Sequence, residues 1–398
     1  MFKTEAAPKR ILIFLLLSAL GLALRLMGIS FESGDWYESL SVWIAELDRG
    51  GLQALSRYTG NYNMPYVTFL LLLTYLPISP LTGIKCLSIL FDYICAFTGG
   101  KLAVLCCEES AVSKETVFLA AYGGILLAPT VIVNSAWWAQ CDSIYVGFVF
   151  LAIFYMLKNK TARSMIFWGA ALAFKLQTVL AFPVLLIYYW KNKKFSFVYF
   201  LIIPLTMETL CLPAILGGCS PLISLTTYLG QTGENQSMCY FYSNLWTFFN
   251  WAPYWVFGRM AVVGTVIALL LIAVLILCRE SYFDRRNILP YFVWLTMTAL
   301  CFLPNMHDRY GYMMELGVIL CAAVNRRKWW QAVTLQAVTM VLYAPVYLRR
   351  YLEYDPRIPA AAWLIVYFAV SFEMINALMG AKEKEQRLSE TKGERRHV

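Results

Sequence analysis

The chain has 398 residues, of which 60% are hydrophobic and only 14% are charged, and its mean hydropathy is +0.60. Soluble domains carry about 25% charged residues, so this composition excludes an ordinary soluble protein and indicates a polytopic membrane protein. The formal net charge of +9 does not indicate a nucleic-acid partner. No basic face is interleaved with aromatic residues, and membrane proteins concentrate Lys and Arg in their cytoplasmic loops.

Long apolar runs recur from residue 11 to residue 380 and predict an all-α transmembrane bundle of about 12 spans, forming a single domain over residues 1–380. A span takes about 20 apolar residues, and fewer where the helix is buried in a bundle. The first run has no A-x-A cleavage site, so we expect an uncleaved helix instead of a signal peptide. The expected spans lie near residues 11–30, 82–105, 116–134, 143–157, 164–174, 178–190, 197–217, 259–278, 288–303, 309–324, 331–347 and 359–380.

Clusters of basic residues between the apolar runs predict the orientation of the chain. Placing every cluster in the cytoplasm puts both termini inside a plasma membrane and makes residues 381–398 a charged cytoplasmic tail. The clusters are Lys9 and Arg10; Lys158, Lys160 and Arg163; Lys191, Lys193 and Lys194; Arg279, Arg285 and Arg286; Arg326, Arg327 and Lys328; and Lys382, Lys384 and Arg387.

This orientation requires that the short apolar run at 66–78 does not cross the membrane. Pro77 and Pro80 close the run, so we interpret it as a re-entrant or interfacial helix in a first outer loop that spans residues 31–81. Residues 36–49 predict a companion amphipathic helix in the same loop. Its apolar face is expected to be formed by Trp36, Val42, Trp43 and Leu47.

The eleven cysteines do not form a disulfide framework. Most lie inside apolar runs, where a cysteine packs as a small hydrophobic residue. No CxxC pair and no Cys/His metal spacing is present. Cys219 and Cys239 share a long outer loop at 218–258, so a disulfide between them and two free thiols are both open alternatives.

The same orientation gathers acids, amides, aromatic residues and a few cations in the outer loops. Ionisable groups at membrane depth are costly and tend to be functional. A carboxylate can deprotonate a hydroxyl group, and cationic side chains can stabilise a leaving phosphate. The set comprises Glu32, Asp35, Glu38, Gln140, Asp142, Lys175, Gln177, Tyr228, Gln231, Glu234, Asn235, Asn244, His307, Asp308, Arg309 and Tyr310.

These residues fall in short motifs whose order and shared face resemble those of GT-C glycosyltransferases. The chain is most similar to the bacterial relatives of the GPI mannosyltransferase 2 group, and the resemblance covers nearly the whole chain. It rests on Asp35 ahead of an N-x-P element at 63–65, on WWAQCDS at 137–143, on AFKLQ at 173–177, on NLW at 244–246 and on LPNMHDRY at 303–310.

The resemblance implies a membrane glycosyltransferase, mannosyltransferase-like, that takes a monosaccharide from a polyprenyl-phosphate donor. Transfer to a lipid or glycan acceptor would occur on the extracytoplasmic side, with inversion at the anomeric carbon. The family's catalytic acid residue maps onto Asp35, and its two juxtamembrane helices match 36–49 and 66–78. Many members carry paired acids, whereas here a lone Asp35 stands between Glu32 and Glu38. We therefore assign no metal ligands and leave a divalent cation open.

Each of these site residues also has a structural interpretation. Asp35 and Asp142 each precede a predicted helix and are favoured N-caps. Lys175 is expected either to contact phosphate or to pair with an acid, and Arg309 either to bind the donor phosphate or to pair with Asp308. The predicted donor-phosphate ligands are Arg309, His307 and Lys175, and the predicted sugar or acceptor ligands are Gln140, Asp142, Asn244, Gln177, Asp308 and Tyr310.

Two further classes of function compete with glycosyl transfer. A transporter or flippase for a lipid-linked or small polar substrate would also contain intramembrane charges, such as Arg25 and Asp92. Arg25 is expected either to snorkel or to pair internally, with Asp92 as the candidate partner, and contact with a lipid phosphate is a further alternative. Transporters often show internal repeats with broken helices, and no repeat is evident in this sequence. A non-catalytic assembly scaffold would not bring the outer polar groups into one cavity.

Overall fold

Eighteen α-helices, joined by short 3-10 and π-helical turns, form the part of the chain that this computed structural model describes: residues 6–108, 112–231, 236–279, 283–350 and 352–394. No strand occurs in these ranges, so the all-α prediction is confirmed. The first nine helices are α1 (Ala6–Leu26), α2 (Ser41–Gly50), α3 (Met64–Thr74), α4 (Pro80–Cys106), α5 (Lys114–Leu126), α6 (Pro129–Ile132), α7 (Asp142–Leu157), α8 (Thr161–Phe174) and α9 (Phe182–Asn192).

The second half of the chain, like the first, contains helices of very different lengths. Glu234 and Asn235, which the sequence placed in the long outer loop, lie outside the described residues, as do the side chains of the tail cluster Lys382, Lys384 and Arg387. The helices are α10 (Ile202–Leu210), α11 (Leu212–Leu216), α12 (Ile223–Gln231), α13 (Tyr254–Leu277), α14 (Ile288–Phe302), α15 (Tyr312–Val324), α16 (Trp329–Leu342), α17 (Ala344–Leu348) and α18 (Arg357–Glu394).

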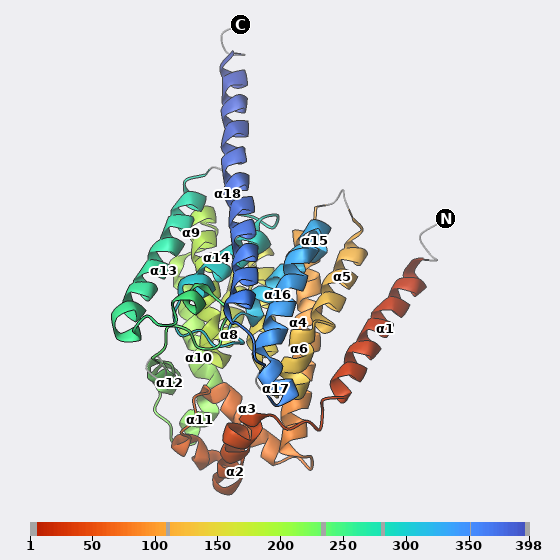
Figure 1. The fold of residues 1–398 in the computed structure, drawn as a ribbon, viewed down its shortest axis with the longest axis vertical. Helices are drawn as coiled ribbons and strands as arrows, with labels where there is room; N and C mark the ends of the chain where they lie inside the picture. The colour runs from red at the N-terminus through yellow and green to blue at the C-terminus, as the bar shows by residue number, and fades with distance from the viewer. Residues whose placement is uncertain (1–5, 109–111, 232–235, 280–282, 351, 395–398) are drawn as a thin grey trace.

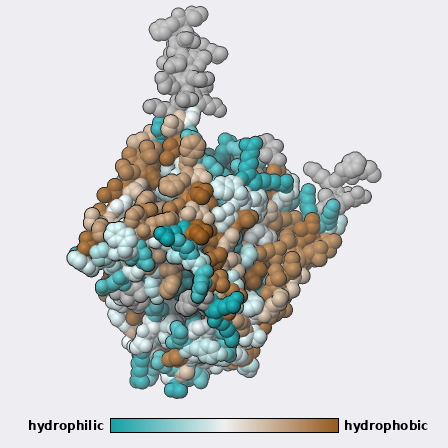
Figure 2. Space-filling model, viewed as in Figure 1, coloured by the Kyte–Doolittle hydropathy of each residue, from teal (hydrophilic) through white to brown (hydrophobic). Residues whose placement is uncertain are grey.

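Three helices in the described residues are long and apolar enough to cross a membrane: α4, α13 and the Arg357–Gly380 part of α18. A fourth span results if α5 and residues 129–137, which are bent by 48° at their junction, count as one. The dozen spans expected from the sequence are therefore not shown. The chain nevertheless has the features of a membrane protein, because α1 and α13 expose large apolar side chains, as Figure 2 shows for the surface over α1.

Helix breaks explain why fewer spans appear than the hydropathy predicted. The expected span at 197–217 is divided between a 3-10 turn, α10 and α11, with Pro213 at the start of α11. Pro345 likewise lies in the first turn of α17, which follows the end of α16. Proline lacks the backbone N–H that an uninterrupted helix needs. The central helix α15 has only 13 residues, which at 1.5 Å per residue is about 20 Å, short of a bilayer core of about 30 Å.

The core lies where α7, α14 and α15 meet. Every residue of α15 from Tyr312 to Ala323 is buried, as is every residue of α14 from Tyr291 to Cys301. Helix α7 packs against α4 and α8, and α8 packs closely against α10. A Cβ atom at Gly169 would lie 2.6 Å from the carbonyl oxygen of Ile203, so this contact requires glycine.

A buried ion pair ties α1 to α4, which decides between the alternatives that the sequence left open for Arg25. Arg25 Nε donates to Asp92 Oδ2 at 2.8 Å, and both side chains are fully buried. Arg25 Nη1 donates to the carbonyl oxygens of Gly21 and Leu126, and Ser135 donates to the same Asp92 oxygen. These bonds make the pair a structural junction between α1, α4 and the turn that follows α6.

The two helices expected in the first outer loop are both present, and they lie together with α11 at the end of the bundle away from the start of α1 and the end of α18 (Figure 1). A π-helical turn at Trp36–Leu40 leads into α2. Three residues of the expected apolar face are in place, since Leu47 is buried and Trp36 and Trp43 pack half-buried against the core. Val42 is exposed instead, and Leu40 and Ile44 are buried.

The alternatives for the cysteines are also resolved within the described residues. Cys219 and Cys239 are both free thiols, and so are the other nine cysteines. Six of the eleven are buried among apolar neighbours in the bundle core: Cys95, Cys106, Cys141, Cys211, Cys301 and Cys321. Burial of this kind agrees with the prediction that most cysteines pack as small hydrophobic residues.

Candidate functional site

A small polar cavity lies between the ends of several helices, at the segment 61–63 that precedes α3. Its volume is about 90 Å³. Segments far apart in the chain contribute to it, namely the loop before α3, the α8–α9 connection, α12 and the loop after α14. The lining residues are Asn61, Tyr62, Asn63, Phe174, Lys175, Leu176, Gln177, Tyr228, Gln231, Tyr240, Asn305, Arg309 and Tyr310. Four predicted site residues, Lys175, Gln177, Arg309 and Tyr310, therefore meet at one cavity.

Asp35 is joined to this cavity through a chain of hydrogen bonds. Gln140 Nε2 donates to Asp35 Oδ2 at 2.7 Å, and Tyr62 donates its hydroxyl hydrogen to Gln140 Oε1 at 2.7 Å. Burial raises the pKa of the Tyr62 phenol well above its usual value, so the group remains a donor at neutral pH. Asp35 makes no side-chain cap to the turn that follows it, so the N-cap interpretation of this residue is wrong.

Asp142 and Lys175 form a buried ion pair beside the same cavity. Asp142 Oδ1 contacts Lys175 Nζ, and Asp142 Oδ2 accepts a hydrogen bond from Asn134 Nδ2 at 2.9 Å. Asp142 makes no side-chain cap at the start of α7 either. The lysine ammonium also lies 5.7 Å from the centre of the Tyr62 ring. Both carboxylate oxygens of Asp142 are thus used to hold Lys175 and the WWAQCDS turn.

Arg309 is the cation of the site that lacks a carboxylate partner among the described residues. Its guanidinium group lies 5.1 Å from the centre of the Trp138 ring, and its Nε atom is buried without a hydrogen-bond partner in the described chain. Asp308 pairs with His307 Nδ1 instead, and Arg309 Nη1 lies 3.5 Å from that nitrogen. The alternative of a structural Arg309–Asp308 pair is therefore not observed, and Arg309 is available to an anion.

Two other predicted ligands occupy different positions relative to the cavity. Gln177 lines it, and its buried Oε1 atom has no hydrogen-bond partner in the described part of the chain. Asn244 does not line it. The Asn244 amide donates to the carbonyl oxygens of Leu300 and Leu303 and accepts from the Trp246 N–H. Its hydrogen-bonding capacity therefore fixes the NLW turn against the end of α14.

The backbone around the site is locally irregular. π-Helical turns cover Trp36–Leu40, directly after Asp35, and Val133–Trp137, directly before the WWAQCDS turn. π-Helical turns inside helical proteins occur frequently at functional sites. Ala139 has a φ of 63°, in the left-handed region that non-glycine residues rarely adopt. This conformation sets the turn from which the Gln140 side chain reaches Asp35.

Sequence reasoning did not assign roles to two residues that organise the site. Tyr62 connects Gln140 to the cavity, and Asn134 positions Asp142. Tyr62 directly precedes the N-x-P element, so that motif could have pointed to it. Asn134 lies within an apolar run, and no motif there indicates a functional residue. Within the described residues, no three His, Cys, Asp or Glu side chains come together in a way that could hold a metal ion.

Comparison with known proteins adds no family to these observations. No protein-family model matches the chain. No curated protein matches it either. The interpretation of the site therefore depends on its own residues and geometry.

Proposed function

We propose that the chain is an inverting membrane glycosyltransferase, mannosyltransferase-like, that uses a polyprenyl-phosphate sugar as donor and a lipid or glycan as acceptor. The observation that carries the proposal is a hydrogen-bonded carboxylate linked to a cavity that is lined by a guanidinium group without a carboxylate partner among the described residues. Asp35 reaches it through Gln140 and Tyr62, and Arg309 lines it. Glycosyl transfer needs both a base and an anion-binding cation.

In the proposed reaction, Asp35 accepts the proton of an acceptor hydroxyl while that oxygen attacks the anomeric carbon of the donor. The bond between the anomeric carbon and the phosphate oxygen breaks, and both of its electrons leave with the polyprenyl phosphate. The hydrogen bond from Gln140 occupies Oδ2 of Asp35, which leaves the other carboxylate oxygen for the proton. A positioned base of this kind contributes about 10²–10⁴-fold to a rate.

The leaving phosphate gains negative charge as the bond breaks, and Arg309 is the residue best suited to stabilise it. The Arg309 guanidinium presents hydrogen-bond donors that no carboxylate uses among the described residues, and Arg forms paired bonds to phosphate. Lys175 lines the same cavity and would add a second positive charge, partly offset by Asp142. His307 contacts Asp308 and does not line the cavity, so it would contribute to phosphate binding only from the cavity's edge.

The cavity is smaller than a complete substrate. Small-molecule pockets usually measure about 300–1,000 Å³, so a volume of about 90 Å³ accommodates a phosphate-sized group. Donor binding then requires one wall to move. The Gln231 side chain donates to the Asn61 carbonyl oxygen and joins α12 to the first outer loop. We propose that this contact opens when the donor enters from the membrane.

The proposal includes an orientation. Arg10, Lys158, Arg285 and Arg286 line one shared pocket, and Lys191 of another basic cluster donates to the Leu277 carbonyl oxygen at the end of α13. We propose that this basic end faces the cytoplasm with both termini, that the short bundle helices supplement the long ones to give about 12 crossings of a plasma membrane, and that the candidate site faces outward.

The rival function, transport of a lipid-linked or small polar substrate, predicts a polar path near the middle of the bundle. The polar cavity described above lies beside the first outer loop, at helix ends. Glycosyl transfer accounts better for that position. Transport assays with the same lipid-linked sugars in reconstituted vesicles would separate the two functions, because a flippase moves its substrate without changing it.

The test is sugar transfer by membranes that contain the protein, incubated with a panel of radiolabelled polyprenyl-phosphate sugars and extracted lipid or glycan acceptors. We expect the protein to move label into an acceptor, and the Asp35→Asn variant to lose at least about 100-fold of this activity at unchanged expression. EDTA in parallel reactions determines whether a divalent cation is required.

The matched control is Glu38→Gln, which removes a carboxylate that is exposed in the turn directly after Asp35. This variant should transfer sugar at the rate of the unmodified protein. Near wild-type transfer by Asp35→Asn would show that another residue is the base, and no transfer from any donor in the panel would remove support for the function itself.

A further inference from the structure

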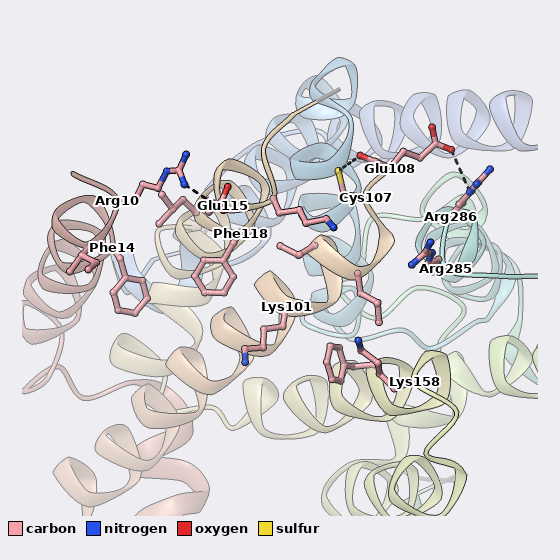
Figure 3. Close-up of a pocket in the computed structure, with 16 residues that line it drawn as sticks. Arg10, Phe14, Lys101, Cys107, Glu108, Glu115, Phe118, Lys158, Arg285 and Arg286 are labelled. Carbon is pink, nitrogen blue, oxygen red and sulfur yellow. Dashed lines mark hydrogen bonds and ion pairs between the residues drawn. The ribbon is translucent and has the colours of Figure 1, made fainter. Parts of the chain in front are cut away.

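A second and much larger pocket opens at the other end of the bundle, beside the start of α1. Its volume is about 920 Å³, roughly ten times that of the candidate site. Its walls come from α1, α4, α5, the end of α7 and the segment before α14, and Figure 3 shows their side chains around one hollow. The proposed glycosyl transfer makes no use of this pocket.

The rim of this pocket is strongly cationic. Its lining has four more basic side chains than carboxylates. The basic residues are Arg10, Lys101, Lys114, Lys158, Arg285 and Arg286, and the carboxylates are Glu108 and Glu115. Arg10 pairs with Glu115 at 3.4 Å and Arg286 with Glu108 at 3.7 Å. Lys101, Lys158 and Arg285 have no ion pair with any described residue. The pocket therefore presents positive charge that its own carboxylates leave uncompensated.

Lys101 is the most informative of these cations because it lies inside a candidate membrane span. It precedes the last residue of α4 by five positions, which at 1.5 Å per residue is about 7.5 Å along the helix. Its side chain is exposed and lies 4.9 Å from the centre of the Phe97 ring. A lysine at that depth without a carboxylate needs an anion or water.

The wall below the cations is apolar. Phe14 of α1 and Phe118 of α5 lie 6.3 Å apart, ring centre to ring centre, and Phe154 of α7 lies beneath Lys158, whose ammonium is 5.9 Å from that ring. On α1 the adjoining Ile11 and Leu15 are more than half exposed. A ligand held here meets positive charge at one end and aromatic and aliphatic carbon at the other.

We propose that this pocket binds an anionic glycerophospholipid, with its phosphate headgroup among Lys101, Lys158 and Arg285 and its acyl chains along Phe14 and Phe118. Charge complementarity favours an anionic headgroup over a zwitterionic one, since each Lys or Arg near the bilayer surface adds to the attraction. The apolar wall favours a lipid over free phosphate. Such a lipid would fill the space between α1 and the body of the bundle.

The test uses the full chain purified in a mild detergent. Native mass spectrometry measures the affinity for phosphatidylglycerol and for phosphatidylcholine with the same acyl chains. We expect the unmodified protein to prefer phosphatidylglycerol, and Lys101→Gln/Lys158→Gln to weaken phosphatidylglycerol binding by about 10-fold or more. The control Lys160→Gln/Arg326→Gln removes two exposed cations that do not line the pocket and should change binding less than about twofold.

Three results would overturn the proposal. Equal affinity of the unmodified protein for the two lipids would show that the cations do not select an anionic headgroup. Equal weakening by the pocket variant and the control would show a general charge effect. Displacement of the lipid by millimolar inorganic phosphate would show that the pocket recognises phosphate without the acyl chains. The single variant Lys101→Gln, with its elution profile on size-exclusion chromatography, checks that lost binding is not lost folding.

Discussion

The molecule contains two buried ion pairs that look alike and differ in their surroundings. Arg25–Asp92 joins α1 to α4 with both side chains fully buried. Lys175–Asp142 is nearly as buried, but its lysine lines a cavity. Both regions also contain polar atoms without partners among the described residues, such as Arg25 Nη2 and Arg309 Nε. The two pairs differ in whether a ligand can reach them, because only Lys175 lines a cavity. Burial of a charge alone therefore does not identify a functional site.

Breaking the fully buried Arg25–Asp92 pair should have the largest effect on stability. Arg25→Met leaves Asp92 buried without its cation, which costs about 3–5 kcal/mol of unfolding free energy. We expect a strongly lowered unfolding temperature and poor recovery of monodisperse protein in detergent. Arg25→Met/Asp92→Leu should recover most of this loss, because replacing both charges with apolar groups is often close to neutral. A single variant as stable as the unmodified protein would contradict the structural role.

Arg309→Gln should show the opposite behaviour. Arg309 has no carboxylate partner among the described residues, so we expect the unfolding temperature to change little. Sugar transfer should fall about 10²–10³-fold, the usual cost of removing one donor that stabilises a developing negative charge. Arg57→Gln, an exposed arginine in the segment between α2 and α3 that does not line the cavity, is the matched control and should retain activity. If Arg309→Gln is strongly destabilised and its sugar transfer is unchanged, then Arg309 is a structural residue like Arg25.

Asn244 tests whether a predicted ligand is a structural residue. Asn244→Ala leaves the carbonyl oxygens of Leu300 and Leu303 without their donor and should lower the unfolding free energy by about 1–3 kcal/mol. Transfer per folded molecule, measured on the monodisperse fraction, should stay near that of the unmodified protein. If Asn244→Ala loses sugar transfer at unchanged stability, Asn244 is a sugar or acceptor ligand, as the sequence predicted.

Tyr62→Phe should have the smallest effect and tests how Asp35 is positioned. It removes the hydrogen bond to Gln140 Oε1, and a typical bond of this kind contributes about 0.5–1.5 kcal/mol. We expect kcat to fall about 3- to 10-fold with KM nearly unchanged, because Tyr62 acts through Gln140 on the base. Tyr75→Phe, an exposed tyrosine beyond α3, serves as the control. A change in KM alone would place Tyr62 in substrate binding instead.

Part of this architecture follows from the sequence because it depends on local patterns. Apolar composition and helical runs predicted an all-α chain. Arg25 and Asp92, two of the charges inside the expected spans, were candidates for an ion pair, and this pair is present. The number of spans was not predictable in the same way. Hydropathy does not register that the helices break at Pro213 and Pro345, each in the first turn of a new helix. The breaks leave segments too short to be spans by length.

The sequence by itself determined which chemical groups are present and that they follow one another in short motifs. Only the tertiary structure decided how they combine. Gln140 bonds to Asp35 across 105 positions of the chain, and Lys175 pairs with Asp142 across 33. Packing of α7 against α8 brings Asp142 to Lys175, and no local pattern encodes either contact. For the same reason only the fold shows that Asn244 holds a turn while Arg309 is left to face a cavity.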